Sequence, residues 1–293
     1  MNSFRGFLAI LFLSINTIIW CIPLYSMGLL RWLAPIPALR NRISGAMDIT
    51  MHGWVGGNRI MNAALGLHSN ELTLVVNKPL MEAKKYIVVC NHRSWADIFV
   101  LQHTLRGIIA PLKFFTKREL IWLPLLGVAF WLLGFPYVRR RGQDRAELAK
   151  TCEGFKQHPV AVLNFLEGTR FTPAKREQKK STYDHLLPPK VGGLAHVLGE
   201  LGEQIDQIVD VTIAYPGGTP SFWQFLKGEA GRVLVDINTY PVPVQGQDRS
   251  LTEEELADLK DWTERVWRTK DAYLQEHLPP QVTAQIREVQ VEE

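Results

Sequence analysis

Residues 85–97 read KYIVVCNHRSWAD, and this stretch predicts how the chain folds. The run from Tyr86 to Cys90 is short, apolar and bounded by polar residues, as expected of a strand buried on both faces. Ser94 and Asp97 have the spacing of a capping box, so a helix should follow the strand at once. A buried strand that runs directly into a helix is typical of an α/β sheet.

Two interpretations of His92 and Asp97 are open on these residues alone. A helix cap accounts for Asp97 without any chemistry. It does not account for His92, which we expect at the exposed end of the strand. Because helical side chains lean toward the N-terminus, the Asp97 carboxylate can reach back to His92. A carboxylate on Nδ1 would fix the tautomer and leave Nε2 free as a base.

The same alternation of elements recurs along the chain. Strands alternating with helices predict an α/β fold, with a mixed sheet flanked by helices. Residues 171–190 are polar, basic and bounded by prolines, which predicts a loop. The expected strands are 86–90, 160–168, 207–215 and 231–240, and the expected helices are 48–67, 97–106, 144–157, 190–203 and 252–277.

Residues 6–30 contain no charged side chain. A helix needs roughly 20 apolar residues to cross a bilayer, and no A-x-A-like site of a signal peptide follows. We therefore expect residues 1–45 to be a hydrophobic membrane-anchoring helical segment and residues 46–293 to be the α/β domain. Pro23 leaves open a second arrangement, in which two shorter helices dip into one leaflet.

The arginines that follow this segment bear on its orientation. Arg31, Arg40 and Arg42 place the rest of the chain in the cytoplasm if the segment spans the bilayer. A second uncharged stretch, residues 120–138, is interrupted by prolines and glycines and has basic residues at both ends. Its flanking charges give no preferred orientation.

The composition excludes few classes of function. The chain has 293 residues and a formal net charge of +4, which suits a membrane surface, a phosphorylated ligand or nucleic acid. Three cysteines without a CxxC pair disfavour a disulfide framework or a zinc site. The chain has no G-x-S-x-G pattern, which argues against a covalent serine mechanism, and no H-E-x-x-H or P-loop pattern that would suggest a metal.

A second motif, NFLEGTRF, lies at residues 164–171. Gly168 allows a tight turn or the close approach of a ligand. The guanidinium of Arg170 matches phosphate oxygens. In isolation, the motif could equally be a surface pair of Glu167 and Arg170 at a turn.

Together, the two motifs resemble the glycerolipid acyltransferase family, whose best-known members are the PlsC-type lysophosphatidate acyltransferases. Asn91-His92 with Asp97 matches the family's N-H-x-x-x-x-D block. Phe165-x-Glu167-Gly168-Thr169-Arg170 matches F-x-E-G-T-R, with Leu166 where proline is commoner. The resemblance is close over residues 85–216 and looser to the C-terminal helix at 252–277. Two less specific blocks match at 116–120 with 134–139, and at 211–216.

The resemblance implies transfer of a fatty acyl group from acyl-CoA or acyl carrier protein to the hydroxyl of lysophosphatidate, giving phosphatidate. His92 would be the general base and Asp97 its orienting partner. Backbone N–H groups at the helix start after His92 are the candidates for an oxyanion hole. No metal and no cofactor beyond the acyl donor are implied. The substrate-binding residues implied are Lys117, Arg139, Glu167, Gly168, Thr169 and Arg170.

The implied partners are the phospholipid bilayer, a lysophospholipid acceptor and the acyl donor, with no nucleic acid. We expect the inner membrane, with the catalytic domain facing the cytoplasm. Because His92 and Arg170 must act on one substrate, residues 120–138 should not cross the bilayer. Two alternatives are a different lysophospholipid acceptor, and a catalytically idle lipid-binding membrane protein on the same fold.

Overall fold

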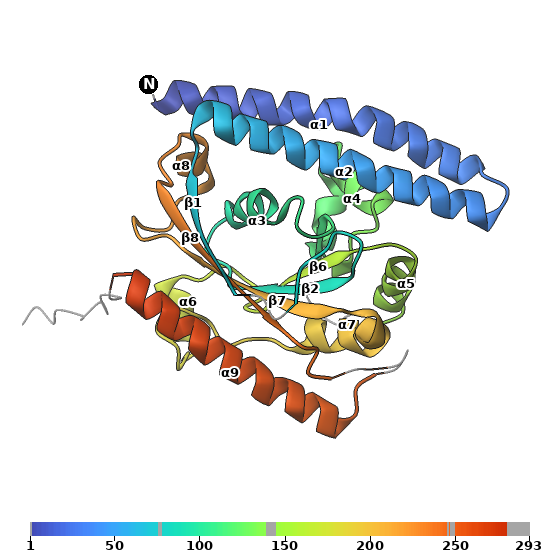
Figure 1. Ribbon diagram of the computed structural model, residues 1–293. Coiled ribbons are helices and arrows are strands. Elements are labelled where there is room, and N and C mark those ends of the chain that lie inside the picture. Colours follow the sequence, from blue (N-terminus) through green and yellow to red (C-terminus); the bar gives the residue numbers. More distant parts are fainter. Residues whose placement is uncertain (1, 76–77, 139–144, 245, 247–249, 280–293) are drawn as a thin grey trace, which may run out of the picture.

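A computed structural model describes residues 2–75, 78–138, 145–244, 246 and 250–279 (Figure 1). Its centre is a six-stranded mixed sheet with the strand order β1-β8-β7-β2-β6-β3. Pairing is parallel throughout the run β7-β2-β6-β3, whereas β8 is antiparallel to β7 and parallel to β1. The strands are β1 (Ser69–Val75), β2 (Tyr86–Cys90), β3 (Leu112–Phe114), β6 (Ala161–Phe165), β7 (Gln207–Ala214) and β8 (Arg232–Tyr240). The predicted mixed α/β sheet is thus confirmed.

Helices cover both faces of the sheet, and β2 is buried between them. On one face, Tyr86, Val88 and Cys90 pack with α3 (Asp97–Leu105). On the other face, Ile87 and Val89 pack with side chains of three helices. These helices are α5 (Arg145–Lys156), α7 (Gly192–Leu201) and α9 (Glu253–His277). Two of them, α7 and α9, lie below the sheet in Figure 1.

Several local features differ from the sequence prediction, among them strand β3, which is three residues long and was not predicted. The expected loop at 171–190 contains a short helix, α6 (Pro173–Gln178), because Thr172 caps it by accepting the Lys175 N–H. Strand β1 was not predicted, since it lies at the sheet edge and exposes side chains such as Leu72 and Leu74 instead of showing a buried run.

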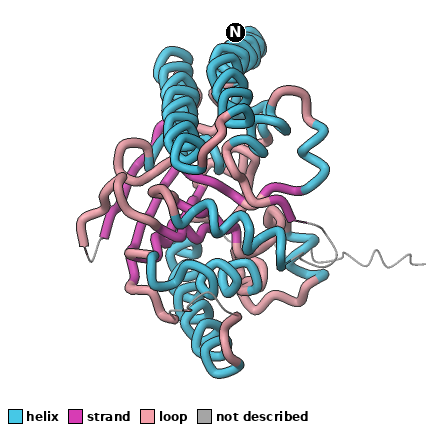
Figure 2. Tube along the Cα trace, turned by 90° about the vertical axis from the view of Figure 1, so that its right-hand side faces the viewer, coloured by secondary structure: helices cyan, strands magenta, loops and turns pink. Residues whose placement is uncertain are grey.

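Two long helices, α1 (Asn2–Leu33) and α2 (Pro37–Leu65), lie side by side along one face of the molecule (Figures 1 and 2). The Asn16 amide joins them by donating to Trp54 O at 2.9 Å and Asn58 Oδ1 at 3.0 Å. Helix α1 continues through Pro23, so the arrangement with two shorter helices is not adopted. The expected boundary after residue 45 falls inside α2. Among the described residues, α1 is the one helix long and apolar enough to cross a membrane.

Both ends of α1 contact the α/β part of the molecule. Near its start, Arg5 donates to Lys227 O at 3.4 Å, just after α8 (Phe222–Leu226). Near its end, the Tyr25 hydroxyl donates to Leu125 O, at the start of α4 (Leu126–Leu132). Since α4 and α8 belong to one folded body, α1 lies along that body and does not project from it.

The second uncharged stretch forms no long helix. It contains a 3₁₀ turn, η1 (Arg118–Trp122), then α4, then the strand β5 (Tyr137–Val138), which pairs with β4 (Thr116–Lys117). Phe130 and Leu133 of this stretch pack with Cys21 and Leu24 of α1. None of these elements is long enough to span a bilayer, in agreement with the sequence prediction.

A buried ion pair fixes α9 to the sheet, and its removal gives a first prediction. Lys270 Nζ lies 2.8 Å from Asp210 Oδ1 and donates to Val211 O and Thr212 Oγ1 at 2.7 and 2.9 Å. In Lys270→Met the Asp210 carboxylate remains buried without its partner. The free energy of unfolding should fall by about 3–5 kcal/mol, measured by chemical denaturation in detergent.

The control replaces both partners by apolar residues of similar volume. The double variant Asp210→Leu/Lys270→Met leaves no unpaired charge, so it should recover much of the lost stability. An unchanged denaturation midpoint in Lys270→Met would show that the pair does not hold α9.

Candidate active site

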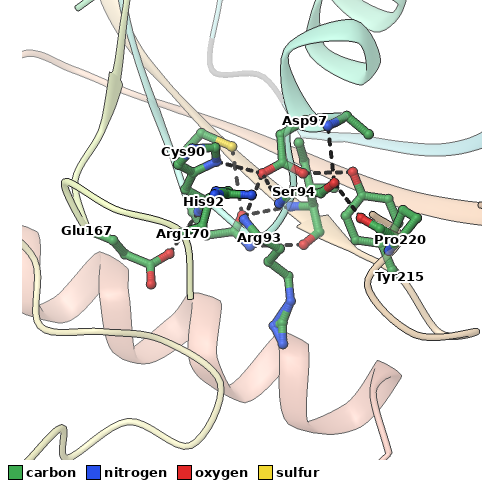
Figure 3. A network of polar contacts seen from close by, with 12 residues as sticks. Cys90, His92, Arg93, Ser94, Asp97, Glu167, Arg170, Tyr215 and Pro220 are labelled. Atoms are coloured by element: carbon green, nitrogen blue, oxygen red, sulfur yellow. Dashed lines mark hydrogen bonds and ion pairs between the residues drawn. The ribbon is translucent and has the colours of Figure 1, made fainter. Parts of the chain in front are cut away.

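The candidate site lies at the carboxyl edge of the sheet. Strands β3, β6, β2 and β7 run parallel, so their carboxyl ends meet at the same edge. Lys117 follows β3, Glu167 to Arg170 follow β6, His92 follows β2 and Tyr215 follows β7. Figure 3 shows that the segments after β2, β6 and β7 bring their side chains to one place.

The side chain of Asn91 continues the pairing of β2 with β7 after β2 has ended. Its Nδ2 donates to Ile213 O at 2.9 Å, and its Oδ1 accepts the Ile213 N–H at 2.8 Å. Asn91 is fully buried. The main chain is thus held against β7 just before His92, which fixes where the histidine leaves the sheet.

The Asp97 carboxylate is the centre of a hydrogen-bond network (Figure 3). Its Oδ2 accepts from His92 Nδ1 at 2.9 Å, from the Arg93 N–H at 2.7 Å and from the Ser94 N–H at 2.9 Å. Its Oδ1 accepts from the Tyr215 hydroxyl at 2.7 Å. Because a carboxylate only accepts, His92 Nδ1 carries a hydrogen and Nε2 of the neutral ring does not.

Asp97 therefore serves both purposes that the sequence left open. It satisfies the Ser94 N–H, as the acidic member of a capping box does, and it orients the His92 ring. The other half of the box is absent, since the Ser94 hydroxyl donates to Pro220 O at 2.6 Å and accepts from the Ala96 N–H.

Phe165 and Tyr215 were not predicted as site residues. The His92 ring stacks on Phe165 with the ring centroids 4.1 Å apart and the planes at 18°. This contact and the bond to Asp97 hold the ring at two points, while 15% of the side chain stays exposed. The sequence offered two signals for these site residues, an aromatic residue at the end of β6 and a tyrosine at the end of β7. Neither signal is specific.

The Glu167 side chain is fully buried and contacts the main chain of His92. Its Oε1 accepts the His92 N–H at 2.8 Å and its Oε2 accepts the Leu187 N–H at 2.9 Å. Both oxygens therefore join segments of the protein, and neither is presented to a ligand. Burial raises the pKa of the Glu167 carboxyl to about 7, against the opposing effect of the two N–H donors.

The other predicted substrate-binding residues form the turn after Glu167. Gly168 has φ +64°, the left-handed conformation that favours glycine. Thr169 Oγ1 accepts from Lys175 Nζ at 2.9 Å. The Arg170 guanidinium lies over the Trp95 ring, with Cζ 5.0 Å from the centroid. The turn is held next to His92, because the Phe171 N–H that follows it donates to His92 O at 2.7 Å.

Lys117 and Arg139 are placed only in part. The backbone of Lys117 forms β4 beside β5. Its side chain, and the whole of Arg139, lie outside the described residues.

The backbone donors expected for an oxyanion hole are mostly occupied. The N–H groups of Arg93 and Ser94 donate to Asp97, and that of Ala96 donates to the Ser94 hydroxyl. The Asp97 N–H donates to Ser94 O. That expectation was therefore wrong for these four donors, because two of them hold the Asp97 carboxylate and the other two bond to Ser94 at the helix start. Within residues 2–75, 78–138, 145–244, 246 and 250–279, no cluster of side chains has the arrangement of a metal site.

The burial of Glu167 makes a prediction about stability and pH. The folded state keeps the Glu167 proton up to about pH 7, whereas the unfolded chain loses it near the ordinary value of 4.5. Between these values the unfolded state binds fewer protons, so this group lowers stability as the pH rises. Glu167→Gln does not titrate. Relative to that variant, the wild type should lose up to about 3 kcal/mol between pH 4.5 and 7.

Denaturation curves of both proteins across this pH range measure the effect. The contributions of other groups cancel in the difference between the two proteins. A difference that is constant with pH would contradict the raised pKa.

Comparison with known proteins is consistent with this site. A family model described as acyltransferase matches residues 72–244. A probable 1-acyl-sn-glycerol-3-phosphate acyltransferase 5 of Arabidopsis thaliana is 31% identical over 68% of this chain and 56% of its own. Lysocardiolipin acyltransferase 1 of Danio rerio is 26% identical over 69% of this chain and 55% of its own. The chain thus spans little more than half the length of these curated relatives.

A solved structure shares the fold. The crystal structure of the 1-acyl-sn-glycerophosphate acyltransferase PlsC from Thermotoga maritima aligns over 95% of this chain and 100% of that one, with a TM-score of 0.55 at 18% identity. The chain therefore belongs to the acyltransferase family, in the PlsC-type glycerolipid branch that its motifs predicted.

Proposed function

We propose that the protein transfers a fatty acyl group from acyl-CoA or acyl carrier protein to the free hydroxyl of lysophosphatidate, giving phosphatidate. The observation that carries this proposal is the His92–Asp97 pair, with Nδ1 bonded to a buried carboxylate and Nε2 left as the acceptor. Family membership and the relatives named for 1-acyl-sn-glycerol-3-phosphate support the choice of substrates.

The chemistry follows from the state of the His92 ring. Nε2 removes the proton of the acceptor hydroxyl while the oxygen attacks the thioester carbonyl. Asp97 stabilises the imidazolium that forms. The tetrahedral intermediate then breaks the carbon–sulfur bond, and the leaving thiolate takes the proton from Nε2. No covalent acyl-protein intermediate is needed, because the acceptor supplies the nucleophile.

Arg170 is the residue best placed for the acceptor's phosphate. It is exposed, it lies over Trp95 in the loop that follows His92, and no carboxylate pairs with it among the described residues. Its fork can bind two phosphate oxygens. In this proposal Glu167 positions the loop between β2 and α3 that carries His92. Lys117 and Arg139 remain predicted phosphate ligands.

Removing the base or its partner tests the mechanism. His92→Ala and Asp97→Asn should each lower kcat by roughly 10²–10⁴-fold, because proton transfer in the transition state is lost or misaligned. His158→Ala, which changes a histidine outside the site, is the matched control and should keep its activity. Full activity in His92→Ala would rule out the mechanism. An inactive wild type would favour a catalytically idle lipid-binding protein.

The acceptor is the part of the proposal with a specific alternative. The similarity to a lysocardiolipin acyltransferase favours a second candidate, an acceptor with another phosphate-linked headgroup. A panel of lysophospholipids assayed with the purified protein separates the two. We expect the highest kcat/KM for lysophosphatidate. A higher kcat/KM for another lysophospholipid would identify that lipid as the acceptor instead.

We further propose that α1 binds one leaflet of the inner membrane from the cytoplasmic side, in the membrane plane. Its outer face and the adjoining α4 region expose apolar side chains, as an interfacial helix does. Contacts at both ends of α1 with a single folded body support an in-plane position over a spanning one. The exposed residues include Phe4, Phe7, Leu11, Ile18, Ile22, Leu29, Trp32, Trp122 and Trp131.

Labelling of single cysteines distinguishes these two positions. Ser3→Cys and Leu33→Cys introduce thiols at exposed sites near the two ends of α1, and the three native cysteines are buried. In sealed inverted membrane vesicles, an impermeant maleimide should label both introduced thiols. Labelling of one thiol alone would show that α1 spans the bilayer.

A further inference from the structure

Three lysines converge on the turn that follows Glu167, and we call Lys175, Lys179 and Lys190 the lysine cluster. Lys175 and Lys179 are four residues apart at α6, so their side chains share one face of the helix. Lys190 comes from the segment before α7. Lys190 is exposed and the other two are half-buried, so the cluster is accessible from solvent.

Contacts tie the lysine cluster to the turn of the candidate active site. Lys175 Nζ donates to Thr169 Oγ1 and to Arg170 O, each at 2.9 Å. The Lys190 side chain crosses over Gly168, where an added Cβ would lie 3.3 Å from Lys190 Cδ and 3.5 Å from Nζ. The cluster therefore adjoins the turn that also donates the Phe171 N–H to His92 O.

The positive charge of the cluster is not balanced within the described structure. Lys179 Nζ is shielded from solvent and has no hydrogen-bond partner. Burial lowers the pKa of Lys179, and repulsion from Lys190 and Lys175 adds to this effect. Among the described residues, Glu167 opposes this effect, but both Glu167 oxygens already accept backbone N–H groups. An unpaired, shielded ammonium among like charges is costly, and such sites are candidates for binding an anion.

We propose that the lysine cluster is an anion site for a phosphate group of a substrate, separate from the Arg170 guanidinium. This inference rests on the proposed function, since both substrates of that reaction class carry phosphate. Ammonium groups bind phosphate as point charges, and several around one group match its charge and its oxygens. A phosphate oxygen here would supply the hydrogen-bond acceptor that the Lys179 ammonium lacks.

We expect the phosphate bound by the lysine cluster to belong to the acyl donor. Arg170, beside Trp95, already serves the acceptor, whose phosphate must lie close to the hydroxyl that reacts at His92. The phosphates of CoA lie far from the thioester along the molecule and need cationic groups beyond this turn. The lysine cluster, reached through Gly168 and Thr169, offers them.

Equilibrium binding to the full chain in detergent tests the site without requiring turnover. Calorimetric titrations use two probes separately, CoA and lysophosphatidate. In the triple variant Lys175→Gln/Lys179→Gln/Lys190→Gln, CoA affinity should fall roughly 10- to 100-fold, because charge-assisted hydrogen bonds to phosphate are lost. Lysophosphatidate affinity should change little. The single variant Lys179→Gln, whose ammonium has no protein partner to lose, should show part of the effect with an unchanged melting temperature.

Lys180→Gln is the matched control. It removes the same charge from an exposed side chain one residue away. CoA affinity should stay at the wild-type value. A loss of lysophosphatidate affinity instead of CoA affinity would support the site and assign it to the acceptor.

Other outcomes overturn the inference. Unchanged affinity for both probes in the triple variant, or equal losses in Lys180→Gln, would show that the cluster is not a phosphate site. If acyl transfer is intact in the triple variant with wild-type KM values, the cluster fails while the proposed function stands. If the wild type binds neither CoA nor lysophosphatidate, both the lysine-cluster site and the proposed function fail.

Discussion

The buried Asp97 carboxylate is the interaction on which the rest of the site depends. Four donors converge on its two oxygens, from His92 Nδ1, two backbone N–H groups and the Tyr215 hydroxyl. A buried carboxylate without such partners would be very unfavourable. The same bonds that offset its burial shape the loop between β2 and α3 and set the tautomer of His92. Capping the helix and orienting the base are one arrangement, not two competing roles.

Parallel strands explain why this arrangement can be assembled from distant segments. Strands β2, β6 and β7 end at one edge, so Glu167 can accept the His92 N–H while Tyr215 donates to Asp97. The loop that carries His92 is thereby held by residues that follow both neighbouring strands, β6 and β7. The antiparallel strand β8 adds width to the sheet but contributes no residue to this network.

The sequence was most informative where burial was complete. The run Tyr86–Cys90 was predicted with its observed limits, because both of its faces are covered. Strand β1 was missed, since an edge strand with exposed side chains has no such run. His92, Asp97 and Glu167 could be proposed from motif spacing. Tyr215 and the lysine cluster could not, because their partners are brought to them only by the pairing of strands and the position of α6.

The tautomer of His92 reports most directly whether Asp97 prepares this ring to act as a base. Nitrogen NMR of histidine-labelled protein, assigned with His92→Ala, reports which ring nitrogen carries the hydrogen. We expect a hydrogen on Nδ1 and a bare Nε2 in the neutral ring, with this pattern lost in Asp97→Asn. A neutral His92 that carries its hydrogen on Nε2 would contradict this expectation.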